Sequence, residues 1–162
     1  MTGESNKAKT GVFWNIDHCP IPGGFSPGEI KEFIKVSLKK EGYLGDVSIW
    51  AYSDKTSVVD ELEKDYYDHG SIILRKLVEG VSKVNSMIMD ILLFCLDNAA
   101  PSNIYVISKD IEEDTVLFDI LQSLESEDYC ILVAQPSEEF LSEALLPIVS
   151  FHWCWPGESD LE

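Results

Sequence analysis

The sequence predicts an α/β domain: a three-layer, doubly wound and mainly parallel sheet. Short apolar runs rich in β-branched and aromatic residues alternate with longer segments of helical periodicity. This alternation requires parallel strands joined by right-handed crossovers, with helices on both faces of the sheet. The run at residues 103–108 is almost continuously apolar, which is typical of a strand buried on both faces.

The first strand is expected at Gly11–Ile16, and a loop rich in proline and glycine follows it. Ser26 is a candidate helix N-cap, Pro27 takes the first helical position, and Glu29 completes a capping box. Apolar residues at helical spacing then predict a helix that Gly42 closes.

The same patterns predict the remaining elements. The helix at residues 82–96 is so apolar that we expect it to be central and buried. In order, the expected elements are strand 47–52, helix 57–67, strand 71–74, helix 82–96, strand 103–108, helix 113–124, strand 129–134, helix 137–146 and an edge strand at 151–155. Residues 1–9 are predicted to be a disordered tail, residues 10–156 a single domain, and residues 157–162 a C-terminal tail.

Composition restricts the classes of partner. The net charge of −17 over 162 residues argues against a broad nucleic-acid-binding surface, which is normally basic. The first helix nevertheless carries a stripe that could contact RNA, composed of Lys31, Lys35, Lys39 and Lys40. An ordinary solvated helix face is the alternative interpretation of that stripe. The four cysteines form no CxxC pair, which predicts free thiols and disfavours zinc.

No segment indicates a membrane or a secretory route. No apolar run approaches the roughly 20 residues that cross a bilayer, and the first residues lack the apolar centre of a signal peptide. We therefore expect a cytoplasmic protein with no membrane partner.

Acidic residues follow two of the predicted strands. Asp17 follows the first strand, and Asp110 follows the strand at residues 103–108. If these strands are neighbours, Asn15 or Asp17 faces Asp110 across a crevice, where doubly wound sheets bind ligands. Clustered carboxylates repel one another unless they hold a divalent cation, which can activate water for attack on a phosphodiester. Three further acids, Glu112, Glu113 and Asp114, belong either to this cluster or simply to a helix N-terminus.

Four segments carry a family resemblance. Gly11-Val-Phe-Trp-Asn-Ile-Asp-His-Cys-Pro-Ile-Pro22 resembles the opening G-V-F-W-D-I-E-N-C-P-V-P of the NYN domain. The other three are residues 89–101, which resemble V-D-M-L-F-W-A-L-D-N-P-A-P, residues 103–110, which resemble a strand ending in S-G-D, and residues 129–136, which resemble Y-N-I-L-L-A-Q-P. The NYN domain is a PIN-like ribonuclease fold. The sequence resembles plant NYN proteins similar to the meiosis regulator and mRNA stability factor family.

The resemblance implies cleavage of single-stranded RNA with Mg²⁺ or Mn²⁺. It assigns catalytic roles to Asp17, Asp110 and Glu112, and Glu113 or Asp114 could replace Glu112. The implied metal ligands are Asn15, Asp17, Asp90 and Asp110. His18 and Lys109 are candidate RNA contacts, although a loop histidine without such a role is the alternative for His18.

Several expected acids are replaced in this chain. The first catalytic aspartate of the family falls on Asn15, another acid falls near Ala51 or Tyr52, and a third falls on or near Val84. Losing one charged element of a catalytic site typically lowers the rate by about 10²–10³. The sequence therefore predicts a degenerate NYN domain that regulates gene expression by binding RNA or protein. The alternative is an active Mg²⁺- or Mn²⁺-dependent endoribonuclease. The family-level alternative to the cytoplasm is the peroxisome.

Overall fold

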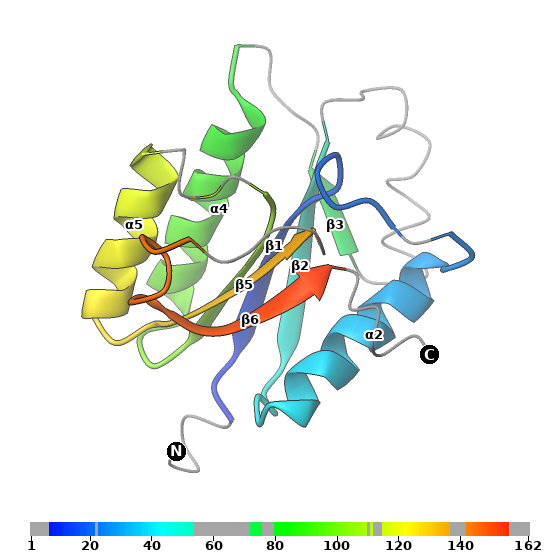
Figure 1. The fold of residues 1–162 in the computed structure, drawn as a ribbon, viewed down its shortest axis with the longest axis horizontal. Helices are drawn as coiled ribbons and strands as arrows, with labels where there is room; N and C mark the ends of the chain where they lie inside the picture. The colour runs from blue at the N-terminus through cyan, green and yellow to red at the C-terminus, as the bar shows by residue number, and fades with distance from the viewer. Residues whose placement is uncertain are drawn as a thin grey trace.

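The computed structural model describes residues 7–21, 23–53, 72–75, 80–109, 111, 115–136 and 142–155. Figure 1 shows α4 and α5 packed on one side of a twisted sheet and α2 on the other. The elements are β1 (Thr10–Asn15), α2 (Pro27–Lys40), β2 (Val47–Tyr52), β3 (Ile72–Arg75), α4 (Lys83–Asp97), β4 (Asn103–Ile107), α5 (Thr115–Ser126), β5 (Cys130–Pro136) and β6 (Val149–Trp155). None of the described helices is long and apolar enough to cross a membrane.

The sheet has six strands in the order β3-β2-β1-β4-β5-β6, and all its pairings are parallel. The chain builds outward from β1 to β3 and then returns to add β4 on the other side of β1. The strand order therefore reverses between β1 and β4, where Trp14 is paired with Ile107. This topology confirms the predicted fold class and puts the ligand-binding crevice of such folds at the carboxyl ends of β1 and β4.

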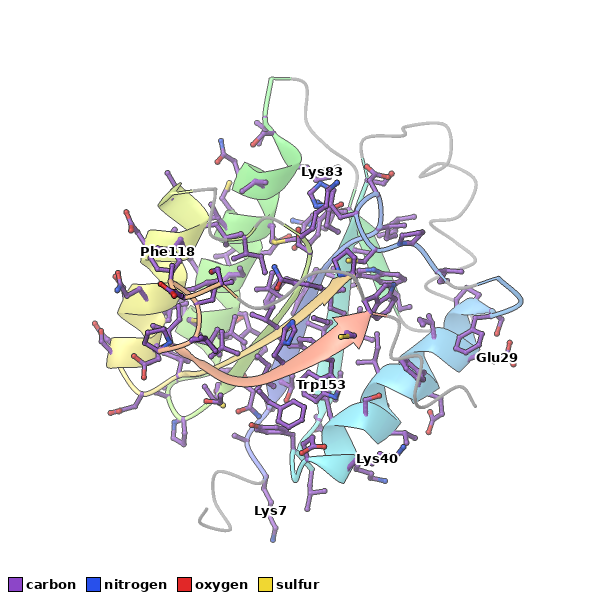
Figure 2. The ribbon with its side chains drawn as sticks, viewed as in Figure 1. Lys7, Glu29, Lys40, Lys83, Phe118 and Trp153 are labelled. Carbon is purple, nitrogen blue, oxygen red and sulfur yellow. The ribbon has the colours of Figure 1, made fainter. Side chains whose placement is uncertain are left out.

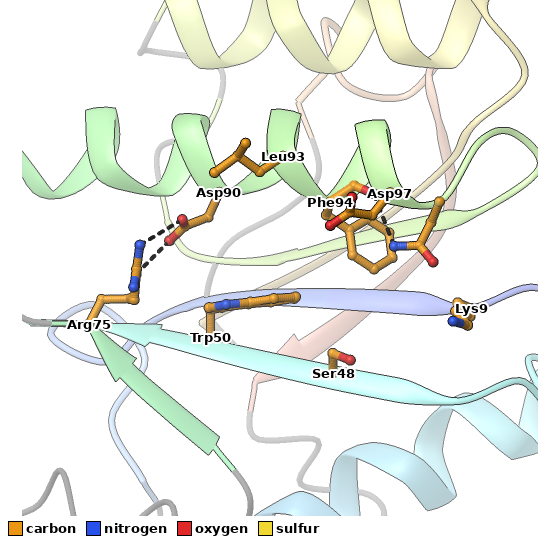
Figure 3. A pocket seen from close by; sticks show the side chains of 9 residues that line it. Lys9, Ser48, Trp50, Arg75, Asp90, Leu93, Phe94 and Asp97 are labelled. Atoms are coloured by element: carbon orange, nitrogen blue, oxygen red, sulfur yellow. Dashed lines mark hydrogen bonds and ion pairs between the residues drawn. The ribbon is translucent and has the colours of Figure 1, made fainter.

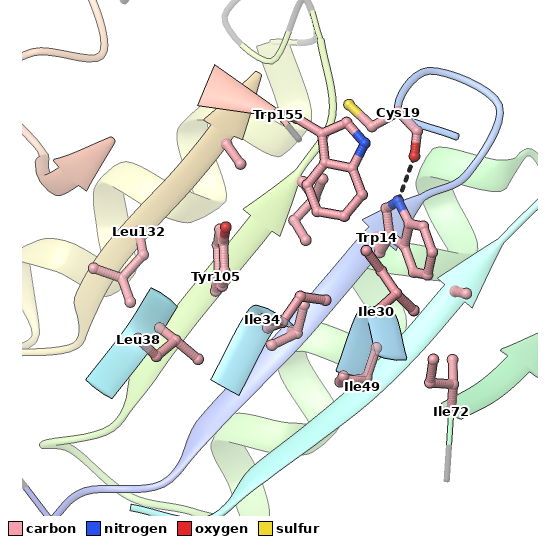
Figure 4. Packing of buried hydrophobic residues seen from close by; sticks show 14 of the residues in the cluster. Trp14, Cys19, Ile30, Ile34, Leu38, Ile49, Ile72, Tyr105, Leu132 and Trp155 are labelled. Atoms are coloured by element: carbon pink, nitrogen blue, oxygen red, sulfur yellow. Dashed lines mark hydrogen bonds between the residues drawn. The ribbon is translucent and has the colours of Figure 1, made fainter. Parts of the chain in front are cut away.

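Alternating residues of the strands pack into two separate cores. On the α2 side, Trp14 of β1 packs against Trp155 of β6, with ring centroids 5.4 Å apart (Figure 4). On the α4 side, Phe13 stacks on Trp50 and meets Phe94 edge-on. The Trp14 indole also donates a hydrogen bond of 2.6 Å to the carbonyl of Cys19 (Figure 4). That bond holds the loop after β1 against the core, next to the crevice at the end of this strand.

The start of α2 has the predicted capping box. The Ser26 hydroxyl accepts the Glu29 amide at 3.2 Å, and the Glu29 carboxylate accepts the Ser26 amide at 2.9 Å. Gly42 has φ of +92°, so it closes the helix with a backbone conformation that glycine adopts without strain.

Replacing Ser26 with alanine should lower the free energy of unfolding by about 1 kcal/mol, because one helical amide loses its acceptor. Urea denaturation of the native chain and the variant measures this difference. Ser26→Asp is the matched control, since aspartate also caps helices, and it should remain within about 0.5 kcal/mol of the native chain. Equal losses in both variants would contradict the capping role.

Two predicted helices differ from the structure, and a third lies outside the described residues. The helix expected at 57–67 falls in the part that is not described. Of the segment 137–146, the described residues are 142–146, and residues 143–148 form turns closed by bonds such as that from the Leu145 amide to the Ser142 carbonyl, 3.1 Å. Pro147 cannot donate a helical hydrogen bond, which favours turns there. Helix α4 is buried on the side that faces the sheet, but its other side is exposed at Leu93 and Leu96, so the expected burial is confirmed for one side only.

Two further expectations are confirmed for the described residues. The edge strand forms as β6 beside β5, and all four cysteines are free.

His152 of β6 should make stability depend on pH. Burial lowers the pKa of His152, and its buried Nε2 has no hydrogen-bond partner among the described residues. The unfolded chain therefore binds a proton more readily than the folded chain, and stability should fall as pH drops below about 6.5. The glutamine of His152→Gln stays neutral at every pH. Between about pH 7.5 and 5.5 the native chain should therefore lose more free energy of unfolding than the variant does. A difference independent of pH in urea denaturation would contradict this.

Candidate active site

The chain turns sharply at the carboxyl end of β1. The Asn15 side chain is 1 % exposed, and its Oδ1 accepts the backbone amides of Asp17 at 3.1 Å and His18 at 3.2 Å. Asparagine favours this kind of turn because its short side chain can replace a backbone carbonyl as acceptor. The turn places the Asp17 and His18 side chains at the crevice between β1 and β4.

His18 joins the two strands across the point where the strand order reverses. Its Nδ1 lies 3.2 Å from Asn15 Nδ2 and 3.0 Å from the hydroxyl of Ser108, the residue after β4. Because Asn15 Oδ1 already accepts two amides, Asn15 Nδ2 is the donor toward the ring. His18 Nδ1 is then an acceptor, and the neutral ring carries its proton on Nε2.

Asp17 forms an ion pair inside the crevice. Its Oδ2 accepts a hydrogen bond of 2.8 Å from the ammonium of Lys83, and its Oδ1 accepts one of 2.8 Å from the hydroxyl of Ser53. The Lys83 and Asp17 side chains are only 12 % and 17 % exposed. Figure 2 shows Lys83 at the start of α4, at the end of the sheet where the chain leaves β1. Burial on this scale strengthens the attraction between the charges and makes the loss of either partner costly.

Asp90 is held by three hydrogen bonds. Arg75, at the end of β3, donates to both of its oxygens, with each distance 3.0 Å (Figure 3). Tyr52 donates from its hydroxyl at 2.8 Å. Asp90 is 6 % exposed, so this carboxylate is neutralised inside the protein. Burial, followed by the nearby charge of Asp90, raises the pKa of Tyr52 well above its ordinary value. Its hydroxyl therefore remains a donor across the physiological range.

These two acids lie at one edge of the sheet. Asp17 contacts Ser53 and Asp90 contacts Tyr52, and Tyr52 and Ser53 are consecutive residues at the end of β2. Tyr52 is at the place where the family resemblance puts an acid, and it reaches Asp90 as a hydrogen-bond donor. Ala51, beside it, is fully buried in the opposite core.

The described residues do not fit a divalent cation. Both oxygens of Asp17 and both of Asp90 already accept hydrogen bonds, and three of these four oxygens accept from the ammonium of Lys83 or the guanidinium of Arg75. The Asn15 side-chain oxygen is used by the turn. In the described part of the chain, no three His, Cys, Asp or Glu side chains are grouped to hold a metal ion.

The structure brings together some of the predicted site residues. Asn15, Asp17 and His18 form one network, and Asp90 lies next to it through β2. Lys109 is exposed beside Ser108, and its contact with RNA stays a prediction. The other four predicted acids, Asp110, Glu112, Glu113 and Asp114, lie outside the described residues.

Sequence reasoning missed the residues that bind these acids. They are Ser53 after β2, Arg75 at the end of β3, Lys83 at the start of α4, and the hydroxyl of Tyr52. One signal was available. The carboxyl ends of all parallel strands lie at the same edge of the sheet, and the two acids lie at that edge. A cation at the end of β3 is therefore within reach of an acid on the following helix.

The lysine stripe of α2 is partly assembled. Lys31, Lys35 and Lys39 line a cavity of about 390 Å³ together with Asp46. Lys40 is not among the residues that line it. The cavity therefore collects three of the four lysines that the sequence suggested as an RNA contact.

Comparison with known proteins identifies the domain. The family model described as the NYN domain matches residues 9–147 of this chain. No curated protein matches the chain significantly.

Proposed function

This chain belongs to the NYN domain family, and from that premise we propose that it is a degenerate, RNA-associated regulator of gene expression with weak or no nuclease activity. One observation carries the proposal: the ammonium of Lys83 is bound to Asp17 at 2.8 Å, inside the crevice. The resemblance to the plant relatives of the meiosis regulator and mRNA stability factor extends this proposal to the control of mRNA stability in the cytoplasm.

Charge supports the loss of catalysis. A metal-dependent nuclease needs uncompensated carboxylates that a divalent cation neutralises. In this chain, Lys83 neutralises Asp17, Arg75 neutralises Asp90, and the uncharged Asn15 stands where the family has an aspartate. A metal ion would have to displace two cations that are fixed to the fold, and it would find one fewer negative charge.

Two observations support association with RNA. The first is the family itself, whose fold is related to nucleases. The second is the cavity on α2 lined by Lys31, Lys35 and Lys39, which concentrates positive charge in a protein of net charge −17. Ammonium groups attract phosphates at short range even where the protein as a whole repels them.

Incubation of the native chain with a labelled single-stranded RNA in Mg²⁺ or Mn²⁺ tests the proposal. We expect RNA binding in fluorescence anisotropy, with binding that weakens as salt rises, and no cleavage on a gel. Cleavage by the native chain that EDTA and Asp110→Asn both abolish would overturn the proposal in favour of an active endoribonuclease. Absence of RNA binding at low salt would overturn the RNA-associated role.

A further inference from the structure

The outer side of α4 is apolar and exposed to solvent. Met89 is 59 % exposed and Leu96 is 80 % exposed. The spacing of the exposed residues, at positions i, i+3, i+4 and i+7, puts them in one line along the helix. We call them the α4 stripe: Met89, Leu92, Leu93 and Leu96. The buried residues of α4 lie on the opposite side of the helix and face the sheet: Met87, Ile88, Asp90, Ile91 and Phe94.

The fold and the crevice leave the α4 stripe unexplained. A single exposed leucine is ordinary, but a contiguous line of large apolar side chains marks a contact surface. A helix that is apolar all round is normally covered all round. None of the four residues takes part in the described hydrogen bonds of the crevice, and all four stay exposed although α5 contacts α4.

A cavity beside the stripe could receive a side chain. It has a volume of about 510 Å³, and its central part is lined by Trp50, Leu93 and Phe94 (Figure 3). Its charged side chains are the Arg75–Asp90 pair at one end, Lys9 at the other end, and Asp97 next to Phe94 on α4. The apolar surface of the α4 stripe therefore continues through Leu93 and Phe94 to Trp50 on β2.

The charges near the stripe are mainly negative. The described charged residues of α4 and α5 are Asp90, Asp97, Asp119, Glu125 and Lys83. Lys83, the one cation in this described set, is bonded to Asp17 in the crevice, and Asp90 is bonded to Arg75. Among the described residues, the carboxylates of Asp97 on α4 and of Asp119 and Glu125 on the neighbouring helix α5 form no ion pair, and Lys9 is the one cation of the cavity without such a pair.

We propose that the α4 stripe docks an amphipathic helix of a partner protein whose apolar residues are flanked by lysine and arginine. Apolar side chains of that helix would cover the stripe, and its cations would face the carboxylates of α4 and α5. A second copy of this chain is a poor occupant because it would bring the same carboxylates and a charge of −17 to the interface. RNA is a poor occupant because the stripe offers neither cations nor aromatic rings. The proposal does not depend on whether the crevice cleaves RNA.

Titration of the full chain into a labelled synthetic helix tests the proposal. The probe is a leucine–lysine peptide with leucine at i, i+3, i+4 and i+7, and its partner probe has every lysine replaced by glutamate. We expect saturable binding of the lysine peptide and no binding of the glutamate peptide. The stripe variant Leu92→Gln/Leu96→Gln should bind the lysine peptide at least about tenfold more weakly. The control Leu44→Gln/Leu146→Gln changes two leucines that are exposed elsewhere and should bind within about twofold of the native chain.

Several results would overturn the proposal. Equal binding by the stripe variant and the native chain would show attraction by net charge alone. Equal losses in the stripe and control variants would show that the peptide has no preference for the stripe over other exposed leucines. Tight binding of the glutamate peptide, or no binding of either peptide, would exclude a basic helical partner. A native dimer in sedimentation velocity that dissociates in the stripe variant would identify a second copy as the occupant. If the double variant unfolds early by circular dichroism, Leu96→Gln alone, at the most exposed position, should still weaken binding at least about threefold.

Discussion

The double variant Asn15→Asp/Lys83→Ala should bind Mn²⁺ and cleave single-stranded RNA at least about 10²-fold faster than the native chain. Removing the ammonium of Lys83 releases Asp17 Oδ2, which it holds at 2.8 Å. An aspartate at position 15 can still accept the amides of Asp17 and His18 with one oxygen. The second oxygen of that aspartate then takes the place of Asn15 Nδ2 and supplies the negative charge that the family has at this position. Calorimetric titration with Mn²⁺ and a gel assay with labelled RNA measure the two effects.

The single variants separate the two causes. Asn15→Asp alone should gain little, because Lys83 still neutralises Asp17, and Lys83→Ala alone still lacks the charge at position 15. Lys83→Arg in the Asn15→Asp chain keeps a cation beside Asp17 and should remain inactive. Lys7→Ala is a matched control for loss of an exposed lysine outside both the crevice and the cavity on α2. Metal binding by the double variant equal to that of the native chain would contradict the view that these two positions silence the site.

The sheet and its switch point could be predicted because local patterns determine them. Continuous apolar runs identified β1, β2 and β4, and the Ser26–Glu29 box identified the start of α2 to the residue. Alternation of strands and helices then required a parallel sheet. The helical prediction for residues 142–146 was wrong because the turn bonds near Pro147 depend on how the chain meets β6.

The state of the crevice could not be predicted from the same patterns. The motif around Asn15 and Asp17 pointed to the correct edge of the sheet, but the partner of Asp17 is Lys83, far along the chain. The partner of Asp90 is Arg75, which comes from the short strand β3. Ion pairs of this kind depend on how α4 is placed relative to the ends of the strands. No local periodicity in a single sequence predicts that placement. The exposed side of α4 was missed for the same reason, since composition does not say how many faces of a helix are covered.

The Arg75→Ala variant should have a free energy of unfolding about 2–3 kcal/mol lower than that of the native chain. Asp90 is 6 % exposed, and without Arg75 the hydrogen bond from Tyr52 is the only one it keeps among the described residues. A fully buried pair would lose about 3–5 kcal/mol, but Arg75 is 47 % exposed, so solvent partly compensates the stranded carboxylate. Arg75→Lys keeps the charge but cannot donate to both oxygens, and it should fall between the native chain and the alanine variant. Urea denaturation at constant pH provides the measurement.

A double-mutant cycle with Asp90→Asn isolates the pair itself. If the stranded charge causes the loss, then Arg75→Ala should destabilise the Asp90→Asn chain by no more than about 1 kcal/mol, because no buried charge remains to strand. Equal losses in both backgrounds would instead mean that Arg75 acts through packing of its stem near Trp50, in the cavity that both residues line. The cycle also bears on the crevice. A strong coupling means that Asp90, which matches the family's second helix aspartate, stabilises the fold through its pair with Arg75. A metal ion could then bind Asp90 only by breaking a contact that stabilises the native state.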